Sequence, residues 1–126
     1  LGNSGGQKFW SWYGFDSRVE WCACFASWCA EQSGMVASGQ VLKFSSCAVG
    51  ASWFQGQGRW KGKGYTPSAG DFIFFDWNKD GQVDHVGIVV NVANGRVNTI
   101  EGNTSNMVAR RSYQLGGIVI VGYGYI

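Results

Sequence analysis

The spacing of hydrophobic and polar residues changes about halfway along the chain. Within residues 17–33, apolar side chains recur three and four positions apart, which predicts an amphipathic helix. The sequence SRVE at 17–20 has the form of a capping box, and Gly34 is suited to end the helix. A short second helix is expected around 37–44. Residues 45–69 are rich in glycine, serine and aromatic residues and are expected to form a long ordered loop.

Beyond Gly70, β-branched and aromatic residues gather in short runs separated by glycine, asparagine and aspartate. The runs predict five strands, at 71–76, 85–92, 96–102, 107–113 and 117–125. The Asn94-Gly95 pair between two of these runs is typical of a two-residue hairpin turn. Such short connections favour an antiparallel meander. Helices followed by strands predict the α+β fold class.

Composition limits the kinds of protein to be considered. The chain has 126 residues, of which 45% are apolar and 14% charged, so we expect a single globular domain over residues 1–126. A net charge of +2 gives no reason to expect a nucleic-acid partner, and no apolar run predicts membrane insertion. An initial leucine without a signal pattern favours a piece excised from a longer protein. The aromatic content of 16% predicts core packing, with a groove for sugars or peptides as the alternative.

Three of the four cysteines lie close together in the sequence WCACFASWC. On a helix, Cys22 and Cys24 point roughly 200° apart, and Cys22 and Cys29 lie about 10 Å apart along the axis. These separations exclude a zinc site within the helix. They also leave Cys47 as the only disulfide partner, for Cys24 or Cys29. The alternative is that these cysteines are free and pack as small apolar residues.

Cys22 is also a candidate nucleophile, because it is the cysteine nearest the start of the predicted helix, where thiol pKa values are lowered. This role suits a helix that begins late, near Glu20 or Trp21. His85 is the only histidine and therefore the only candidate imidazole base. Glu101 and Asn103 lie two positions apart on a predicted strand, so both are expected on one face, where they can orient the imidazole. A structural or surface histidine and a solvent-facing acid remain the alternatives.

These residues lie in sequence blocks that resemble the CHAP domains, the cysteine- and histidine-dependent amidohydrolases/peptidases of bacterial and phage cell-wall lysis. The blocks cover about residues 10–125 in the family's order: WCACFASWCAEQSG, YTPSAGDFIFFDWNKDGQVDHVGIVV, VNTIEGNTSNMVARRSY and GYGY. The resemblance implies a papain-like (NlpC-type) fold, with helices on an antiparallel sheet of about five to six strands. It assigns Cys22 as nucleophile, His85 as base, Glu101 as orienting acid and Asn103 as an assisting amide.

The resemblance also implies the reaction. A Cys22 thiolate would cleave an amide bond in the peptidoglycan stem peptide or cross-bridge through a thioester, and no cofactor is required. The backbone N–H of Cys22 and a second donor within residues 10–18, with Tyr13 as the candidate, would bind the oxyanion. Trp21 and Trp77 are candidates for the walls of a substrate groove.

Several functions remain open at this point. The enzyme would be an endopeptidase or an N-acetylmuramoyl-L-alanine amidase. The alternatives are a non-catalytic wall-binding module and a papain-like hydrolase or acyl transferase that acts on protein. The competent residue types at all four catalytic positions argue against the binding module. Bacterial peptidoglycan is the expected partner. We expect a monomer that is secreted or wall-associated, of bacterial or phage origin.

The segment DWNKDGQVD is the one candidate metal loop. Asp76, Asn78, Asp80 and Gly81 match the opening of an EF-hand loop, but the twelfth position is Gly87 where a bidentate glutamate is needed. The same residue types are common in ordinary turns. A calcium site at Asp76, Asn78 and Asp80 is therefore one of two interpretations of this loop.

Overall fold

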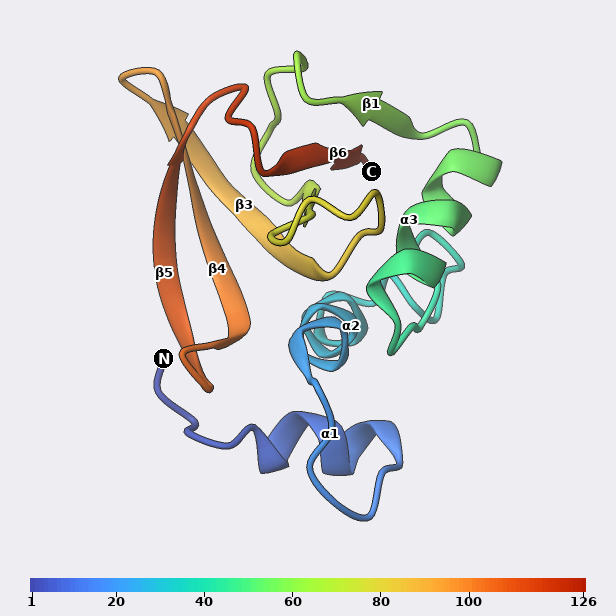
Figure 1. Cartoon of the computed structure of the whole chain (residues 1–126). Helices are drawn as coiled ribbons and strands as arrows, with labels where there is room; N and C mark the ends of the chain where they lie inside the picture. Colours follow the sequence, from blue (N-terminus) through green and yellow to red (C-terminus); the bar gives the residue numbers. More distant parts are fainter.

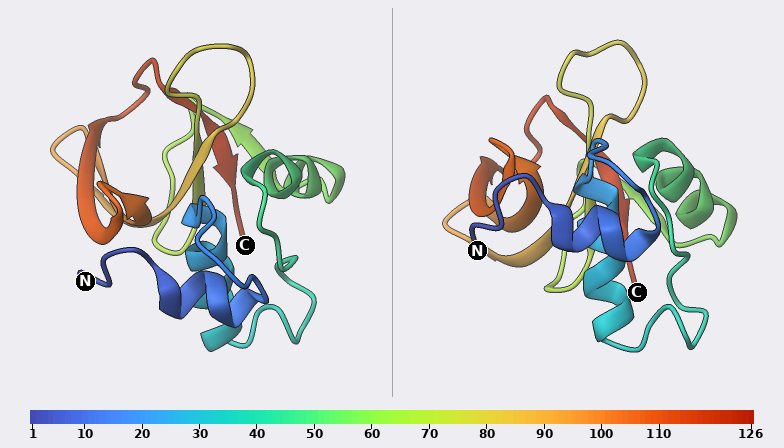
Figure 2. Two further views of the ribbon diagram at one scale, coloured as in Figure 1. Left: turned by 60° about the horizontal axis from the view of Figure 1, so that its bottom comes forward. Right: turned by 90° about the horizontal axis from the view of Figure 1, so that it is seen from below.

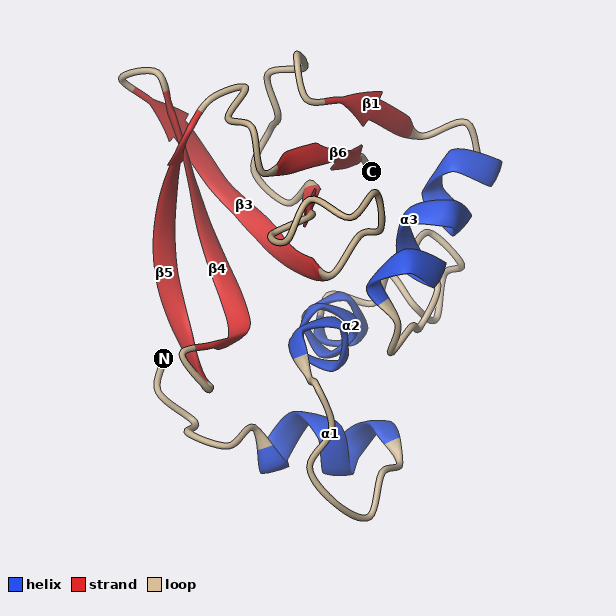
Figure 3. Cartoon of the chain, in the orientation of Figure 1, coloured by secondary structure: helices blue, strands red, loops and turns tan.

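The computed structural model describes all 126 residues and contains three helices and a six-stranded antiparallel sheet (Figure 1). The helices are α1 (Gln7–Tyr13), α2 (Cys22–Gln32) and α3 (Cys47–Gly56). The strands are β1 (Trp60–Gly62), β2 (Phe72–Phe75), β3 (His85–Ala93), β4 (Arg96–Thr104), β5 (Met107–Gln114) and β6 (Ile120–Gly124). Their order in the sheet is β1-β6-β2-β3-β4-β5. The helices lie together on one side of the sheet (Figure 3), which confirms the α+β prediction.

The central strand β2 is buried on both faces because helices cover one face and the curled sheet covers the other. Phe72 and Phe74 pack in the cluster that contains residues of α2 and α3. Ile73 and Phe75 point the opposite way and pack with Tyr123 of β6. This division follows from the alternation of side chains along a strand. It explains why the FIFF sequence is an unbroken apolar run.

Helix α2 lies between the sheet and α1, which crosses it (Figures 1 and 2). An aromatic cluster joins the two helices: Phe9 stacks on Trp21 with ring centroids 5.6 Å apart and meets Phe25 edge-on at 5.0 Å. On its other side α2 approaches β4 closely at Gly102. A Cβ atom at that position would lie 2.4 Å from Cβ of Phe25, so glycine is required there for α2 to pack on β4.

The predicted helix over residues 17–33 begins later than its spacing suggested. Trp21 is the N-cap, no side chain caps the helix, and the expected capping box at 17–20 is wrong. Burial of the Trp21 side chain against Phe9 accompanies a non-helical backbone at this residue, with φ −115° and ψ 14°. The predicted end is confirmed: Gly34, just past the C-cap, has a φ of 77°, which suits glycine.

Two further differences lie in the middle of the chain. Residues 37–44 form turns and non-helical segments, whereas the region expected to be a loop contains α3 and β1. The Ser46 hydroxyl caps α3 by accepting a hydrogen bond from the Val49 N–H. Two glycines within α3 weaken its helical pattern in the sequence. Burial of Phe54 against the sheet stabilises it in the fold.

All five predicted strands are present, with ends that differ by a few residues. Asn94 and Gly95 both have positive φ and form the hairpin turn between β3 and β4, as predicted. Strands β2 to β5 form the expected meander, but β6 pairs with β2 and β1 at the other side of the sheet. None of the helices offers a stretch that is both long and apolar enough to cross a membrane.

Candidate active site

Cys22 is the first residue of α2. The N–H of Phe25 bonds to the carbonyl of Trp21, so the first turn of the helix closes on the N-cap residue. The N–H groups of a helix's first residues have no carbonyl partner within the helix, and they give this end a partial positive charge. The thiol and the backbone N–H of Cys22 therefore both lie where negative charge is stabilised, in the late-starting helix that the catalytic hypothesis required.

His85 is the first residue of β3, which packs against α2, and its ring is buried. Its Nε2–H donates a hydrogen bond of 2.8 Å to Oε1 of Glu101 on the neighbouring strand β4. Since Nε2 is occupied in this way, Nδ1 is the nitrogen left to interact with Cys22, whose negative charge helps to raise the pKa of His85. The structure thus brings together a thiol, an imidazole and a carboxylate that lie far apart in the sequence.

Glu101 is fully buried, and three side chains satisfy its carboxylate. Besides His85, the Tyr113 hydroxyl donates to Oε2 at 2.7 Å, and the Thr99 hydroxyl also donates to Oε2. A buried carboxylate without such partners would be strongly destabilising. Sequence analysis missed both hydroxyls. Thr99 lies two positions from Glu101, so strand alternation could have identified it, whereas Tyr113 needed the pairing of β4 with β5.

Gly87 of β3 makes the space that Glu101 occupies. A Cβ atom on Gly87 would lie 2.6 Å from Cγ of Glu101, which its hydrogen bonds hold in place. We predict that Gly87→Ala lowers the free energy of unfolding by roughly 1–3 kcal/mol, as overpacking of a core does. It should also reduce any activity that depends on the His85–Glu101 pair. Urea denaturation and rate measurements check this prediction.

The matched control for that substitution is Gly62→Ala in β1, where nothing lies within 4 Å of the added Cβ. We expect this variant to differ little from the wild-type protein in stability or activity. If Gly87→Ala were as stable and active as Gly62→Ala, the tight fit around Glu101 would be unimportant.

The environment of Cys22 and His85 favours an ion pair. A hydrogen bond from Cys47 lowers the pKa of Cys22 well below its usual value; burial opposes this, and His85 and the Val86 N–H lower the pKa further. Burial by itself lowers the pKa of His85, but the hydrogen bonds and negative charges of Cys22 and Glu101 outweigh it and raise the pKa to about 9. Both shifts favour a thiolate on Cys22 and an imidazolium on His85.

All four cysteines are free thiols. Of the two interpretations left open by the sequence, the structure shows free cysteines: no bridge joins Cys47 to Cys24 or Cys29, and the Sγ atom of Cys47 lies 3.3 Å from that of Cys22. The start of α3 had not been predicted, so the sequence could not indicate this contact. Burial raises the pKa of both Cys24 and Cys29 to about 11, so these two residues are neutral thiols that pack as apolar groups.

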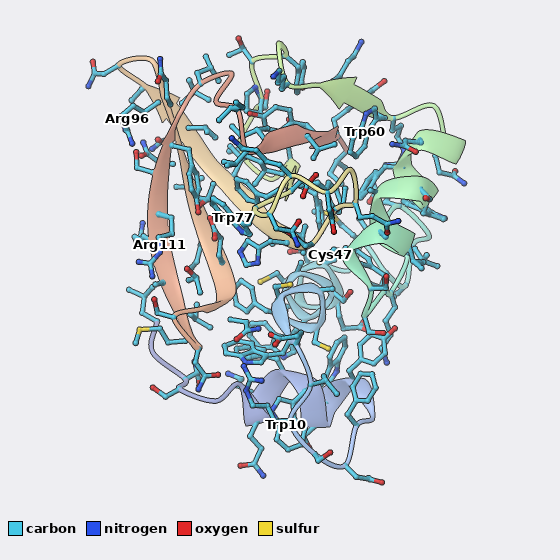
Figure 4. The ribbon with its side chains drawn as sticks, viewed as in Figure 1. Trp10, Cys47, Trp60, Trp77, Arg96 and Arg111 are labelled. Atoms are coloured by element: carbon cyan, nitrogen blue, oxygen red, sulfur yellow. The ribbon has the colours of Figure 1, made fainter.

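The thiol and the imidazole open into a pocket of about 310 Å³. Its lining residues are Glu20, Cys22, Trp77, Asp84, His85, Asn103, Thr104 and Ser105. Trp77 stacks on Phe75 with centroids 4.9 Å apart and stays 43% exposed at the wall of this pocket, and its contact with a substrate stays a prediction. Trp77 and Cys47 both lie in the central region where the sheet meets α2 and α3 (Figure 4).

A larger hollow of about 410 Å³ lies on strands β3 to β5. Arg110, Arg111 and polar side chains line it, without any cysteine, histidine or carboxylate. Arg96 and Arg111 mark this region of the β4–β5 hairpin in Figure 4, away from Cys47. The hollow therefore lacks a base that could activate its hydroxyl groups, whereas the smaller pocket holds both a thiol and an imidazole.

Asn103 lines the pocket but makes no hydrogen bond to His85. The strand register shifts directly after Glu101, and Asn103 has a φ of 57°, so the expected alternation that placed both residues on one face is wrong. The Asn103 side chain accepts a hydrogen bond of 2.9 Å from Arg18 and donates one to Glu20. It holds the rim of the pocket, and Glu101 alone occupies Nε2 of the imidazole.

Two other predicted site residues lie outside the pocket. Trp21 is fully buried against Phe9, so it belongs to the core and forms no groove wall. Tyr13 stacks on Phe15 with centroids 5.5 Å apart, and the ammonium of Lys43 lies 4.7 Å from the centre of its ring. Neither ring lines the pocket, so the prediction of Tyr13 as an oxyanion donor is wrong.

The loop proposed for calcium uses its carboxylates to hold its own backbone. Asp76 accepts hydrogen bonds from the N–H groups of Asp80 and Gly81, and Asp80 accepts one from Gln82. No three acidic, histidine or cysteine side chains converge on one point. Turn formation accounts for these residues, and the calcium site at Asp76, Asn78 and Asp80 stays a prediction.

Comparisons with known proteins agree with this geometry. The family model described as CHAP domain matches residues 12–103. Among solved structures, Ly7917 with the hydrolyzing product of MDP is similar, with a TM-score of 0.56 and 22% identity over 81% of this chain and 52% of that one. A second structure of Ly7917 also has a TM-score of 0.56, with 20% identity over 81% and 51% of the two chains.

The chain thus spans about half the length of Ly7917, and at this identity the likeness concerns the fold. No curated protein sequence matches the chain. The matched family region includes Cys22 and His85, which line the pocket, and the buried Glu101 that bonds to His85. With its papain-like α+β architecture and this match over most of its length, the chain belongs to the CHAP domain family.

Proposed function

We propose that the protein is a cysteine-dependent hydrolase that cleaves an amide bond of bacterial peptidoglycan. The observation that carries the proposal is the pocket in which Cys22, at the start of α2, meets a buried His85–Glu101 pair with a 2.8 Å hydrogen bond. Membership of the CHAP family supports hydrolysis of the cell wall. The structure of Ly7917 with the hydrolyzing product of MDP, a peptidoglycan fragment, supports a substrate of the same kind.

In the proposed reaction the Cys22 thiolate attacks the amide carbonyl, and the backbone N–H of Cys22 donates to the oxyanion that forms. The His85 imidazolium then gives its Nδ1 proton to the departing amine, which leaves a thioester on Cys22 and a neutral imidazole. The imidazole takes a proton from water as the water attacks the thioester. The acid is released, the thiolate is restored, and Glu101 holds the ring throughout from Nε2.

This chemistry serves an endopeptidase and an N-acetylmuramoyl-L-alanine amidase equally, because both cleave amides. We propose that it acts at the wall, as a secreted or wall-associated monomer of bacterial or phage origin. Digestion of purified walls followed by mass spectrometry of the fragments tests the proposal. Peptides freed from intact muramic acid would identify an amidase, and cleavage within the stem or cross-bridge an endopeptidase.

Other fragment patterns would contradict the proposal. New ends only on the sugars would exclude amide hydrolysis. Binding to walls without any new amine would indicate a non-catalytic module. Products joined to an added amine would indicate an acyl transferase, and cleavage of protein with intact walls would indicate a protein hydrolase.

The ion pair predicts a bell-shaped dependence of kcat/KM on pH. Activity should be lost at low pH when the Cys22 thiolate, whose pKa is lowered, becomes protonated. Activity should also fall above about pH 9, because His85 with its raised pKa then loses the proton that the leaving amine needs. Initial rates on solubilised wall fragments between about pH 5 and about pH 11 measure both limbs. A rate that keeps rising through the alkaline range would contradict the imidazolium.

A further inference from the structure

A second thiol lies against the nucleophile, and the reaction above does not use it. Cys47 is the first residue of α3, is buried, and has its Sγ atom 3.3 Å from Sγ of Cys22. This distance lies within the range of a hydrogen bond between sulfur atoms. The first turns of α2 and α3 therefore meet at one pair of sulfur atoms, and one of them opens into the pocket.

The surroundings determine which sulfur carries the charge. Cys22 has the His85 imidazolium and the Val86 N–H beside it, and both stabilise a thiolate. Cys47 has the Asp84 carboxylate in its environment, which disfavours a second negative charge. Two negative sulfurs this close would also repel each other strongly. The charge therefore lies on Cys22, and the remaining proton lies on Cys47, between the two sulfur atoms.

We propose that Cys47 is a positioning residue whose S–H donates a hydrogen bond to the Cys22 thiolate and holds the nucleophile ionised beside His85. The proposal rests on the function proposed above and adds a residue to its site. The reciprocal effects on the two thiols agree with it: the hydrogen bond between them lowers the pKa of Cys22, and together with burial it raises the pKa of Cys47.

A packing role and a donor role predict different behaviour. If Cys47 only fills space, its loss should weaken the fold and leave the ionisation of Cys22 unchanged. If Cys47 is a donor, its loss should raise the pKa of Cys22, because the thiolate then has one hydrogen bond fewer. The more basic thiolate would also be more nucleophilic, so the rate at high pH should stay near the wild-type rate.

The experiment follows alkylation of Cys22 by iodoacetamide against pH, by mass spectrometry of its peptide, under conditions in which all thiols start reduced. In Cys47→Ala we expect the pH at which alkylation of Cys22 is half-maximal to rise by about one unit or more. At pH values below the wild-type midpoint, this shift is a tenfold loss of thiolate. The acid limb of kcat/KM should move by the same amount. Cys47→Val fills the volume of the cysteine side chain without a hydrogen-bond donor. It should shift the midpoint as Cys47→Ala does, so the cavity left by alanine cannot explain the shift.

Two controls complete the design. Cys47→Ser keeps an O–H donor and should hold the midpoint close to the wild-type value. Cys24→Ala removes a buried thiol that has no hydrogen bond to Cys22 and should leave the midpoint unchanged. An unmoved midpoint in both Cys47→Ala and Cys47→Val would overturn the proposal, and so would Cys47→Ser shifting as far as Cys47→Ala.

Alkylation does not depend on a wall substrate, which separates the two proposals. A shifted midpoint in a protein that releases no wall fragments would support the thiol pair and contradict the hydrolase. Wall hydrolysis with an unshifted midpoint would support the hydrolase and contradict the role of Cys47.

Discussion

Replacement of Cys22 by alanine is expected to abolish the hydrolysis of purified cell walls, with a fall in rate on the order of 10⁴-fold or more. The reason is that no other sulfur can take its place. Burial keeps Cys24 and Cys29 protonated, and Cys47 does not line the pocket. The measurements are the turbidity of a wall suspension and the appearance of new amino groups.

Controls separate the loss of a nucleophile from the loss of a packed side chain. Cys22→Ser preserves the shape of the residue, but a hydroxyl beside His85 does not ionise as a thiol does, so this variant should be almost as inactive as Cys22→Ala. Cys29→Ala changes a thiol towards the other end of α2 and should keep the wild-type rate. Unchanged lysis by Cys22→Ala would exclude Cys22 as the nucleophile and leave the family assignment intact.

The local sequence pattern predicted which helix and strands carry the site residues, but it predicted less well where these elements begin and end. The spacing of apolar residues identified α2, but its start depends on the burial of Trp21 against Phe9, which belongs to α1. This contact lies between segments that the pattern treated separately. The position of Cys22 in the first turn is thus a tertiary effect, and sequence alone could state it only as a requirement of the catalytic hypothesis.

The strands that carry His85 and Glu101 were predictable because alternation and the Asn94-Gly95 turn are local features. The position of Asn103 was not predictable, because the strand register shifts after Glu101 and side chains there no longer alternate regularly between the two faces. The contact between Cys22 and Cys47 could not be predicted either, because it also depends on tertiary structure. Predicting this contact requires the position of α3. The glycines of α3 lower its helix propensity, so the sequence pattern does not indicate a helix that is stabilised by packing on the sheet.

The second large effect is expected at Glu101. We predict that Glu101→Ala lowers the free energy of unfolding by about 3 kcal/mol, because it leaves a cavity and removes the acceptor of three hydrogen-bond donors. The rate should fall on the order of 10²- to 10⁴-fold, as it does when the acid that orients a catalytic imidazole is removed. Urea denaturation and wall hydrolysis measure the two effects on the same preparation.

Glu101→Gln distinguishes charge from shape. Its amide can accept from His85 and donate to the hydroxyl of Thr99 or Tyr113, since a hydroxyl also accepts, so this variant should lose much less stability than Glu101→Ala. Without the negative charge the pKa of His85 should fall from about 9, and the alkaline limb of kcat/KM should move to lower pH. If the alkaline limb stayed at the same pH in Glu101→Gln, the carboxylate would fix the orientation of the imidazole ring without raising the pKa of His85. In that case the thiolate of Cys22 alone would hold the imidazolium charged.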